Sequence, residues 1–268
     1  MKVSLITACY NSAGTIGDTV RSVFAQRCRA PVEYIVVDGA STDGTVGVVR
    51  SVRQEIAKSG ARVVGRLVSE PDEGLYDALN KGIGRATGDI VGILNADDRF
   101  DDERVLDDVV AAFEADPGLD CVYGDVRFFR GDSTRTVRYY SSRRWRPWMH
   151  NWGFMPAHPT VYVRRSVFDR FGTYRTGYDI SADFEWMVRC FCRGRMRARY
   201  LPRCFVAMRL GGKSTAGLKA LVRLNVENVR ANRANGYFCV LPMMVPKYLF
   251  KIWGYVFRRR GRSGGENA

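Results

Sequence analysis

The sequence has little of the chemistry that cross-links secreted domains or holds structural zinc. Its 268 residues include seven cysteines and two histidines, and the cysteines are scattered, odd in number and without a CxxC spacing. Disulfide frameworks and zinc sites use cysteines in paired, recurrent spacings. The sequence therefore argues against both kinds of site and fits a reducing compartment such as the cytoplasm.

Long apolar runs are also missing. Residues 1–11 carry one lysine and an apolar run too short for a secretory signal or a membrane span, so we expect a buried strand there. The C-terminal stretch 242–262 is apolar and aromatic but interrupted by charges and prolines. We find no internal repeat, and the GGKST string at 211–215 lacks the spacing of a P-loop, which argues against an ATPase.

What the sequence does have is apolar content and positive charge. Hydrophobic residues make up 46% of the chain, enough for one large core, and the net charge is +14. Such a charge indicates an anionic partner: nucleic acid, acidic lipid or a phosphorylated substrate. Arginines interleave with Trp145 and Trp148 and recur at 258–262 after an apolar stretch. Cations beside aromatic side chains are typical of a lipid interface.

Apolar runs alternate with helical periodicity through the first half of the chain. This alternation predicts an α/β fold with a mostly parallel sheet covered by helices on both faces. The expected strands are 3–7, 33–39, 63–69 and 90–94, and the expected helices are 15–27, a segment around 46–52, and 75–86. Further along, we expect short strands at 121–130, 136–140 and 158–163, and helices at 182–193 and 218–235.

Polar residues follow four successive strands of this predicted sheet. Ligands of parallel α/β sheets bind beyond the carboxyl ends of the strands. The residues at these ends are Tyr10 and Asn11, Asp38, Glu70 and Asp72, and Asn95, Asp97 and Asp98. Each alone could be an ordinary turn or helix cap, but together they predict one site.

The carboxylates at these strand ends suit a phosphorylated ligand. A Mg²⁺ or Mn²⁺ ion held by one or two carboxylates neutralises a diphosphate, and the string NADD at 95–98 supplies them. The alternative is a loop leading into a helix near Glu103. Asp38 could accept a hydrogen bond from a nucleobase imide or could instead cap the turn that follows it, and Asp72 could also belong to a simple turn.

Several strings resemble one enzyme family. They are ITACYNSAGTI, EYIVVDGASTDGT, SEPDEGLYDALNKGIGRATGD, NADD, HPTVYVRRSVF, SADFEWMVRCF and LGGKST. In this order they resemble the family 2 glycosyltransferases of the GT-A fold, particularly those of bacterial capsule, exopolysaccharide and glycolipid pathways. The resemblance covers roughly residues 3–215.

The resemblance implies a role for each motif. The backbone near Thr7 and Ala8, with Tyr10, would frame the nucleobase, and Asp38 would bind its imide. Asp72 would help to hold the base or ribose, Asp97 would contact the ribose or diphosphate, and Asp98 would ligate the metal through the diphosphate. Asp183, at the start of the helix 182–193, would be the general base, although a helix N-cap is its alternative role and Glu185 is a competing carboxylate. His158 is either a structural histidine or a metal or phosphate contact. Lys213 could close over the donor phosphates.

The resemblance also implies the reaction. We expect an inverting, metal-dependent hexosyltransferase that uses a nucleotide-sugar, by preference a UDP-sugar, and a glycan or polyprenyl or other lipid-linked acceptor. Residues 1–235 would form the catalytic domain, with a Rossmann-like donor half (1–117) and an acceptor half (118–235). Residues 236–268 would be a basic amphipathic helical segment that contacts the inner face of the cytoplasmic membrane or packs on the domain.

Two other classes of protein remain as alternatives. A nucleotidyltransferase of sugar activation shares the sheet and the carboxylates but uses a basic glycine-rich loop near its N-terminus, which ITACYNSAGTI lacks. A non-enzymatic binder of membrane or nucleic acid would explain the charge. It would leave the strand-end carboxylates unexplained, because these repel phosphate without a metal, so we expect no nucleic-acid partner.

Overall fold

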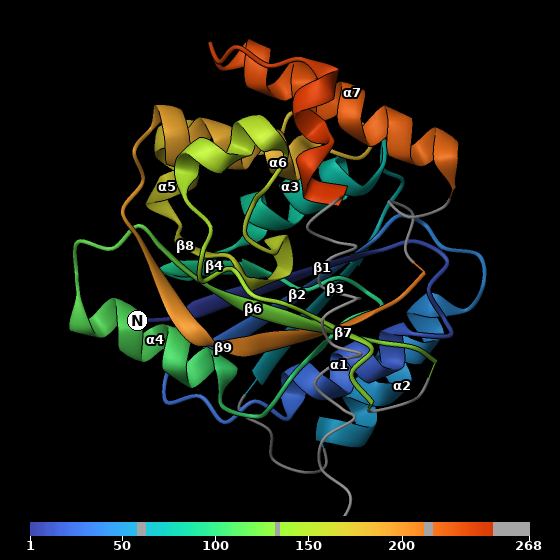
Figure 1. The fold of residues 1–268 in the computed structure, drawn as a ribbon. Helices are drawn as coiled ribbons and strands as arrows, with labels where there is room; N and C mark the ends of the chain where they lie inside the picture. Colours follow the sequence, from blue (N-terminus) through green and yellow to red (C-terminus); the bar gives the residue numbers. More distant parts are fainter. Residues whose placement is uncertain (58–62, 132–134, 212–216, 249–268) are drawn as a thin grey trace, which may run out of the picture.

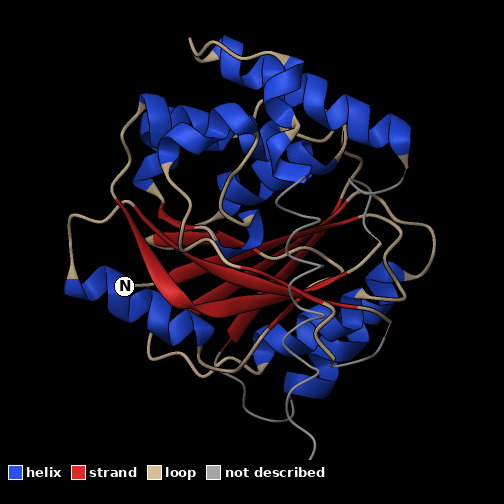
Figure 2. Ribbon diagram, viewed as in Figure 1, coloured by secondary structure: helices blue, strands red, loops and turns tan. Residues whose placement is uncertain are grey.

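The structure is a computed structural model that describes residues 1–57, 63–131, 135–211 and 217–248. Within these residues one nine-stranded sheet carries helices on both faces (Figures 1 and 2). The strand order is β3-β2-β1-β4-β8-β6-β9-β5, and β7 pairs with β6 outside this path. The α/β architecture predicted from the alternating pattern is therefore confirmed.

The first half of the sheet is parallel, as predicted. Its strands are β1 (Val3–Cys9), β2 (Val32–Asp38), β3 (Val63–Ser69) and β4 (Ile90–Ile93). They are linked by α1 (Ile16–Phe24), α2 (Thr45–Ala57) and α3 (Leu75–Arg85). Every residue of β1 and β2 is buried, which explains their nearly continuous apolar sequence, because both faces of these strands are covered by helices.

The second half of the sheet is mixed. Its strands are β5 (Arg99–Phe100), β6 (Cys121–Phe129), β7 (Arg138–Tyr140), β8 (Tyr162–Arg164) and β9 (Ala198–Arg209). β8 is antiparallel to β4 and β6, β9 is parallel to β6, and β5 and β7 are antiparallel to their partners. The remaining helices are α4 (Val105–Ala115), α5 (Ser166–Phe171), α6 (Ala182–Met187) and α7 (Leu218–Ala234).

Alternate residues of the strands supply two cores, one on each face. Val3 and Leu5 of β1 pack with α1, α2 and α4, whereas Ile6 and Ala8 pack with α3, α5 and α6. Figure 1 shows the same two layers, with α1, α2 and α4 on one side of the sheet and α3, α5, α6 and α7 on the other. The carboxyl edge of the parallel strands lies between these layers.

Two predicted elements differ in type from the structure. Residues 158–163 do not form one strand: His158–Thr160 is a 3₁₀ turn, and β8 begins at Tyr162, because Pro159 has no N–H to donate to a sheet ladder. The helix predicted at 182–193 is α-helical only to Met187 and continues as a π-helical turn, Val188–Arg193. We have no physical account of this π turn.

The predicted lipid-facing tryptophans separate into one buried and one exposed side chain. Trp145 is a core residue: its ring packs on Tyr123 and Phe191, and its indole N–H donates to the carbonyl of Phe154. Trp148 is 64% exposed. Among the described residues, no helix has both the length and the apolar character needed to cross a bilayer. The predicted C-terminal segment is described only as far as Tyr248.

Candidate functional site

The carboxyl ends of the parallel strands meet at one edge of the sheet. Cys9 lies opposite Asp38, and Asp38 lies opposite Ser69, in the registers of β1, β2 and β3. A cavity of about 2680 Å³ opens at this edge. The predicted site residues that line it are Ala8, Tyr10, Asn11, Asp72, Asn95, Asp97, Asp98, His158 and Asp183. Acidic side chains from distant stretches of the chain therefore share one cavity, as the strand-end pattern predicts.

Three predicted residues do not line this cavity, and one lies outside the described residues. Glu70 is paired with Arg85 at 3.0 Å instead. The Thr7 side chain is fully buried, and its hydroxyl donates to the carbonyl of Leu94 and accepts from the hydroxyl of Tyr34. Its predicted contact with a nucleobase could therefore involve only the backbone. Asp38 lies behind the cavity wall. Lys213 is among the residues that the structure does not describe.

Asp38 is fully buried and held by hydrogen bonds from the protein itself. One carboxylate oxygen accepts from the backbone N–H of Ser41 at 3.0 Å and from the hydroxyl of Ser69 at 2.7 Å. The other accepts from the Ser41 hydroxyl and from the thiol of Cys9. The turn-capping role left open by the sequence is therefore present. Binding of a nucleobase imide stays a prediction, and it requires one of these donors to move.

The loops around Asp38 are packed closely enough to fix the cavity wall. Asn11, in the left-handed conformation at φ 47°, accepts from the backbone N–H of Thr42 and joins the loops after β1 and β2. A Cβ atom at Gly39 would collide with the carboxylate of Asp72. Asp72 also accepts from the N–H of Gly74 at 2.8 Å, so its carboxylate is oriented at the start of α3.

Asp97 and Asp98 form a pair of neighbouring carboxylates whose negative charge is offset only in part by Arg209. Asp98 is 2% exposed, and it accepts from the amide of Asn95 at 2.9 Å and from the backbone N–H of Arg209 at 3.1 Å. Burial and then the charge of Asp97 raise the pKa of Asp98 to about 8. Burial also raises the pKa of Asp97, and Arg209 offsets this only in part. An added cation would stabilise both ionised groups.

These carboxylates are the residues that could hold a metal ion. In the part of the chain that the structure describes, no group of three or more His, Cys, Asp or Glu side chains could enclose one. Mg²⁺ and related ions are often held by one or two carboxylates, with substrate phosphates completing the coordination. The pair at Asp97 and Asp98 fits such an open site.

Asp183 faces the cavity from the first turn of α6. Its Oδ1 accepts from the backbone N–H of Phe184 at 2.8 Å and lies 3.1 Å from the hydroxyl of Tyr76. The N-cap position of α6 is Ser181, which makes no side-chain cap, and Asp183 accepts the N–H of Phe184 in the first turn from inside the helix. Burial, and then the charge of Asp183, raise the pKa of Tyr76 well above its usual value, so this hydroxyl stays protonated. Oδ2 accepts no hydrogen bond from the described residues, which leaves it available to a ligand.

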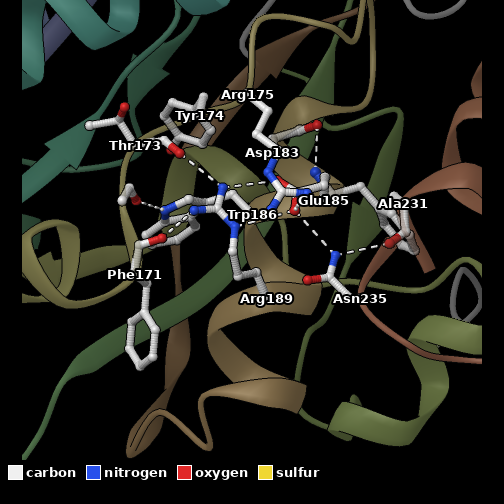
Figure 3. Close-up of polar contacts among 12 residues, drawn as sticks. Phe171, Thr173, Tyr174, Arg175, Asp183, Glu185, Trp186, Arg189, Ala231 and Asn235 are labelled. Carbon is white, nitrogen blue, oxygen red and sulfur yellow. Dashed lines mark hydrogen bonds and ion pairs between the residues drawn. The ribbon is translucent and has the colours of Figure 1, made fainter. Parts of the chain in front are cut away.

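Glu185, the competing carboxylate, is bound by other side chains of the protein. It is fully buried and does not line the cavity. Figure 3 shows it surrounded by Arg175, Arg189 and Asn235, whose side chains point toward it. The guanidinium of Arg189 lies 2.9 Å from Oε2, and both Arg175 and Asn235 contact Oε1, at 3.2 and 3.1 Å. Glu185 is therefore the centre of a buried ion-pair network.

A carboxylate of α7 orients the loop that leads to Asp183. Glu227 accepts hydrogen bonds from the backbone N–H groups of Asp179, Ile180 and Ser181 at 2.9 to 3.1 Å. Three consecutive amides bound to one carboxylate fix the backbone immediately before α6. The position of Asp183 therefore depends on α7 as well as on α6.

His158 lines the cavity beside this group. Its Nε2 lies 2.9 Å from the hydroxyl of Tyr174, and burial lowers its pKa, against the opposing effect of the Asp183 charge. The ring is therefore neutral at neutral pH. It is packed as a structural histidine, one of the two roles left open by the sequence, although it remains within reach of a ligand in the cavity.

Two residues of the site were not singled out from the sequence. Tyr76 contacts Asp183, and Arg209 binds Asp98 through its backbone. The string GLYDALNKG contains Tyr76, and Arg209 directly precedes LGGKST, but neither string shows which distant carboxylate its residue meets. Both contacts link residues more than 100 positions apart.

Comparison with known proteins identifies the family. The sequence profile described as "Glycosyl transferase family 2" matches residues 4–178. The chain is 29% identical to a PGL/p-HBAD biosynthesis glycosyltransferase of Mycobacterium tuberculosis over 203 residues, which are 74% of this chain and 73% of that protein. It is 37% identical to the putative teichuronic acid biosynthesis glycosyltransferase TuaG of Bacillus subtilis over 38% of each chain.

Solved structures agree on the fold. TarS 1–349 of Staphylococcus aureus in complex with UDP-GlcNAc is 18% identical, with a TM-score of 0.63, over 87% of this chain and 68% of that one. The chain spans 40% of a longer TarS chain. The mannosyltransferase PcManGT from Pyrobaculum calidifontis, in complex with GDP-Man and Mn²⁺, is 21% identical, with a TM-score of 0.60, over 98% of this chain and 73% of that one. The expected GT-A fold is thus confirmed, and with the profile match the chain belongs to glycosyltransferase family 2.

Proposed function

We propose that this glycosyltransferase moves a hexose from a UDP-sugar, with inversion at C1, to a hydroxyl group of a glycan or lipid-linked acceptor in the synthesis of a cell-surface polysaccharide or glycolipid. The observation that carries the proposal is that Asp97, Asp98 and Asp183 line one cavity. Asp97 and Asp98 could bind a cation and a diphosphate, and Asp183 could accept the proton of an acceptor hydroxyl group. A nucleotidyltransferase or a non-enzymatic binder would not need Asp183 there.

The donor would lie along the carboxyl edge of the parallel strands. Tyr10 is 57% exposed and offers a ring face to a nucleobase, while Asn11 and Asp72 lie on either side of the buried Asp38. The UDP-GlcNAc complex of TarS supports a UDP-sugar as the donor, and the GDP-Man complex of PcManGT supports a nucleotide-sugar as the donor class.

A divalent cation, Mn²⁺ or Mg²⁺, would neutralise the diphosphate leaving group. Asp98 would ligate it, with Asp97 on the ribose or diphosphate side and Asn95 orienting Asp98 through its amide. The raised pKa values of the two carboxylates support this role, because a bound cation would stabilise the ionised form of both groups. Mn²⁺ bound to PcManGT supports it as well.

Asp183 would act as the general base. An inverting transfer needs a carboxylate that removes the proton of the acceptor hydroxyl as C1 is attacked from the face opposite the nucleotide. The hydrogen bonds at Oδ1 leave Oδ2 for that hydroxyl. Glu185 is a poorer candidate because two arginines and Asn235 already bind its carboxylate.

Replacing Tyr76 by phenylalanine is expected to slow turnover without weakening donor binding. The Tyr76 hydroxyl shares its proton between the carbonyl of Ile180 and Asp183, so it orients Asp183 on the backbone before α6. Loss of a hydrogen bond to a charged group costs roughly tenfold or more. We expect a fall in kcat of about this size at an unchanged KM for the donor. Tyr178→Phe is the control, since that ring belongs to the same buried cluster. Equal losses in the two variants would contradict an orienting role for Tyr76.

The proposed function divides the chain into three parts. Residues 1–117 would bind the donor, 118–235 the acceptor, and 236–268 would form an appended basic segment. The described part of that segment contacts α7, and Lys247 and Tyr248 line the cavity beside Leu224 of α7. We place the enzyme in the cytoplasm, at the inner face of the membrane.

A donor screen tests the reaction class. Purified full-length protein would be incubated with UDP-, GDP- and dTDP-sugars, with Mn²⁺ or with a chelator, and release of the nucleoside diphosphate measured. We expect slow hydrolysis of at least one UDP-sugar that stops in the chelator. Release of pyrophosphate from a nucleoside triphosphate and a sugar phosphate would instead identify a nucleotidyltransferase. No hydrolysis and no binding of any nucleotide-sugar would count against the donor site.

A further inference from the structure

Exposed apolar side chains gather on one part of the described molecule. Seven of its thirteen exposed large apolar residues come from α7, the 3₁₀ helix η1 (Pro147–Trp152) and the segment around the 3₁₀ helix η5 (Leu241–Met244). They are Trp148 (64% exposed), Trp152 (38%), Val222 (55%), Val226 (47%), Phe238 (77%), Leu241 (50%) and Val245 (53%). Tryptophan and phenylalanine at such exposures are costly in water and mark interaction surfaces.

The segments that carry these residues pack on one another. The rings of His150 and Tyr237 lie 4.5 Å apart, His150 also pairs with Asn232 of α7, and the thiol of Cys239 donates to the carbonyl of Asn151 at 3.5 Å. η1, α7 and η5 are thus in mutual contact. The exposed side chains belong to one packed unit, on the side of the sheet where Figure 1 shows α7.

The same unit is rich in arginine and free of acidic residues over long stretches. Residues 141–158, 188–203 and 228–248 contain no Asp or Glu. Arg143, Arg144, Arg146, Arg193 and Arg195 are exposed, and no carboxylate of the described residues pairs with them. Arg193 and Arg195 lie close enough to the hydroxyl of Tyr237 to lower its pKa against the larger effect of burial. By contrast, arginines at 197, 199 and 203 are paired with aspartates.

This surface adjoins the cavity. The turn after η1 contributes Gly153 and Phe154 to the cavity wall, α7 contributes Leu224, and the end of the described segment contributes Lys247 and Tyr248. The elements that expose Trp148 and Phe238 on the outside therefore also line the acceptor side of the site.

We infer that this apolar and basic surface, formed by η1, α7, η5 and the five exposed arginines, docks on a bilayer that contains anionic phospholipid. The arginines meet the headgroups, and Trp148, Phe238 and Leu241 enter the interface. The docking itself follows from the surface alone. Only its purpose, to bring a lipid-borne acceptor to the cavity, depends on the proposed function. A symmetric second copy fits less well, because a twofold contact would bring the unpaired arginines of both copies together.

Vesicle co-sedimentation of the full chain tests the docking. The two vesicle types would be phosphatidylcholine alone and phosphatidylcholine with phosphatidylglycerol. We expect binding that depends on phosphatidylglycerol, and we expect Arg143→Gln/Arg144→Gln to lower the partition coefficient at least about tenfold. Trp148→Ser/Phe238→Ser is expected to lower it similarly.

Matched controls lie outside this surface. Val64→Ser removes an apolar side chain that is 65% exposed on the edge strand β3, and Arg50→Gln/Arg104→Gln removes two exposed arginines. Both controls should partition like the wild type. Melting temperature and donor hydrolysis, measured on every variant, show that loss of vesicle binding is not loss of the fold or of the site.

Three outcomes would overturn the inference. The first is wild-type partitioning by both surface variants, which would assign any binding to residues 249–268. The second is binding that does not depend on phosphatidylglycerol. The third is a change in sedimentation velocity without vesicles, at unchanged vesicle binding, which would make the surface a subunit interface. Failure of donor hydrolysis in every protein would refute the proposed function and leave the docking result standing.

Discussion

Asp98→Asn is expected to abolish metal-dependent sugar transfer while the fold stays intact. The asparagine keeps an oxygen that can accept from the backbone N–H of Arg209, but it removes the negative charge proposed to ligate the cation. A metal contributes several kcal/mol to stabilising a developing phosphate charge, so the loss in kcat should be at least about a hundredfold. The measurements are transfer rate at saturating Mn²⁺ and calorimetric titration of Mn²⁺ in the presence of UDP.

Stability separates this effect from unfolding. Because burial already disfavours the ionised form of Asp98, removing the charge should not lower the free energy of unfolding in the absence of metal. Asp89→Asn is the control: among the described residues this exposed carboxylate accepts only from the backbone N–H of Lys2, and its replacement should leave transfer unchanged. Metal-dependent transfer by Asp98→Asn at the wild-type rate would remove Asp98 as the ligand.

Asp183→Asn should lower kcat by roughly a hundredfold or more, since a positioned general base contributes about that much. Donor affinity should stay unchanged, because the side chain lies on the acceptor side and asparagine can still accept from the N–H of Phe184 and from Tyr76. Single-turnover rates with acceptor, and binding of UDP measured separately, give the two quantities. Hydrolysis of the donor by water should also fall.

Glu185→Gln provides the contrast on the same helix. Its main effect should be on stability, by about 3 kcal/mol, because it leaves Arg189 buried without its carboxylate partner. Thermal unfolding measures this, and turnover at a temperature where the variant is folded should remain close to that of the wild type. A larger loss of turnover in Glu185→Gln than in Asp183→Asn would identify Glu185 as the base.

The parallel half of the sheet could be predicted because β1, β2 and β4 are buried on both faces and therefore nearly continuously apolar. Residues 63–69 form β3 with the expected bounds, and the helix expected at 75–86 ends one residue earlier. The meeting of strand ends at one cavity follows from the same topology, since successive parallel strands present their carboxyl ends at one edge. The positions of Asp72 and Asp98 after predicted strands therefore agree with their place in the cavity wall, and their roles stay predictions.

Contacts between distant residues could not be predicted, because hydrophobic periodicity indicates which side chains are buried and not which side chains they contact. Asp38 finds its donors in Ser41, Ser69 and Cys9, and the last two lie at the ends of other strands. Glu185 and Asp183 look equivalent in the string SADFEW, yet Arg175 and Asn235 approach only Glu185. The same limit applies to Trp145, whose aromatic neighbours in the core come from β6 and the π turn.

The three amides held by Glu227 have a mechanical consequence. They tie the backbone before Asp183 to α7, the helix whose other side exposes Val222 and Val226. If α7 rests on lipid as inferred above, the height of the base over the bilayer is set by this rigid connection and not by loop motion. The enzyme would then transfer sugar to hydroxyl groups at one depth of the headgroup layer and not to those above or below that depth.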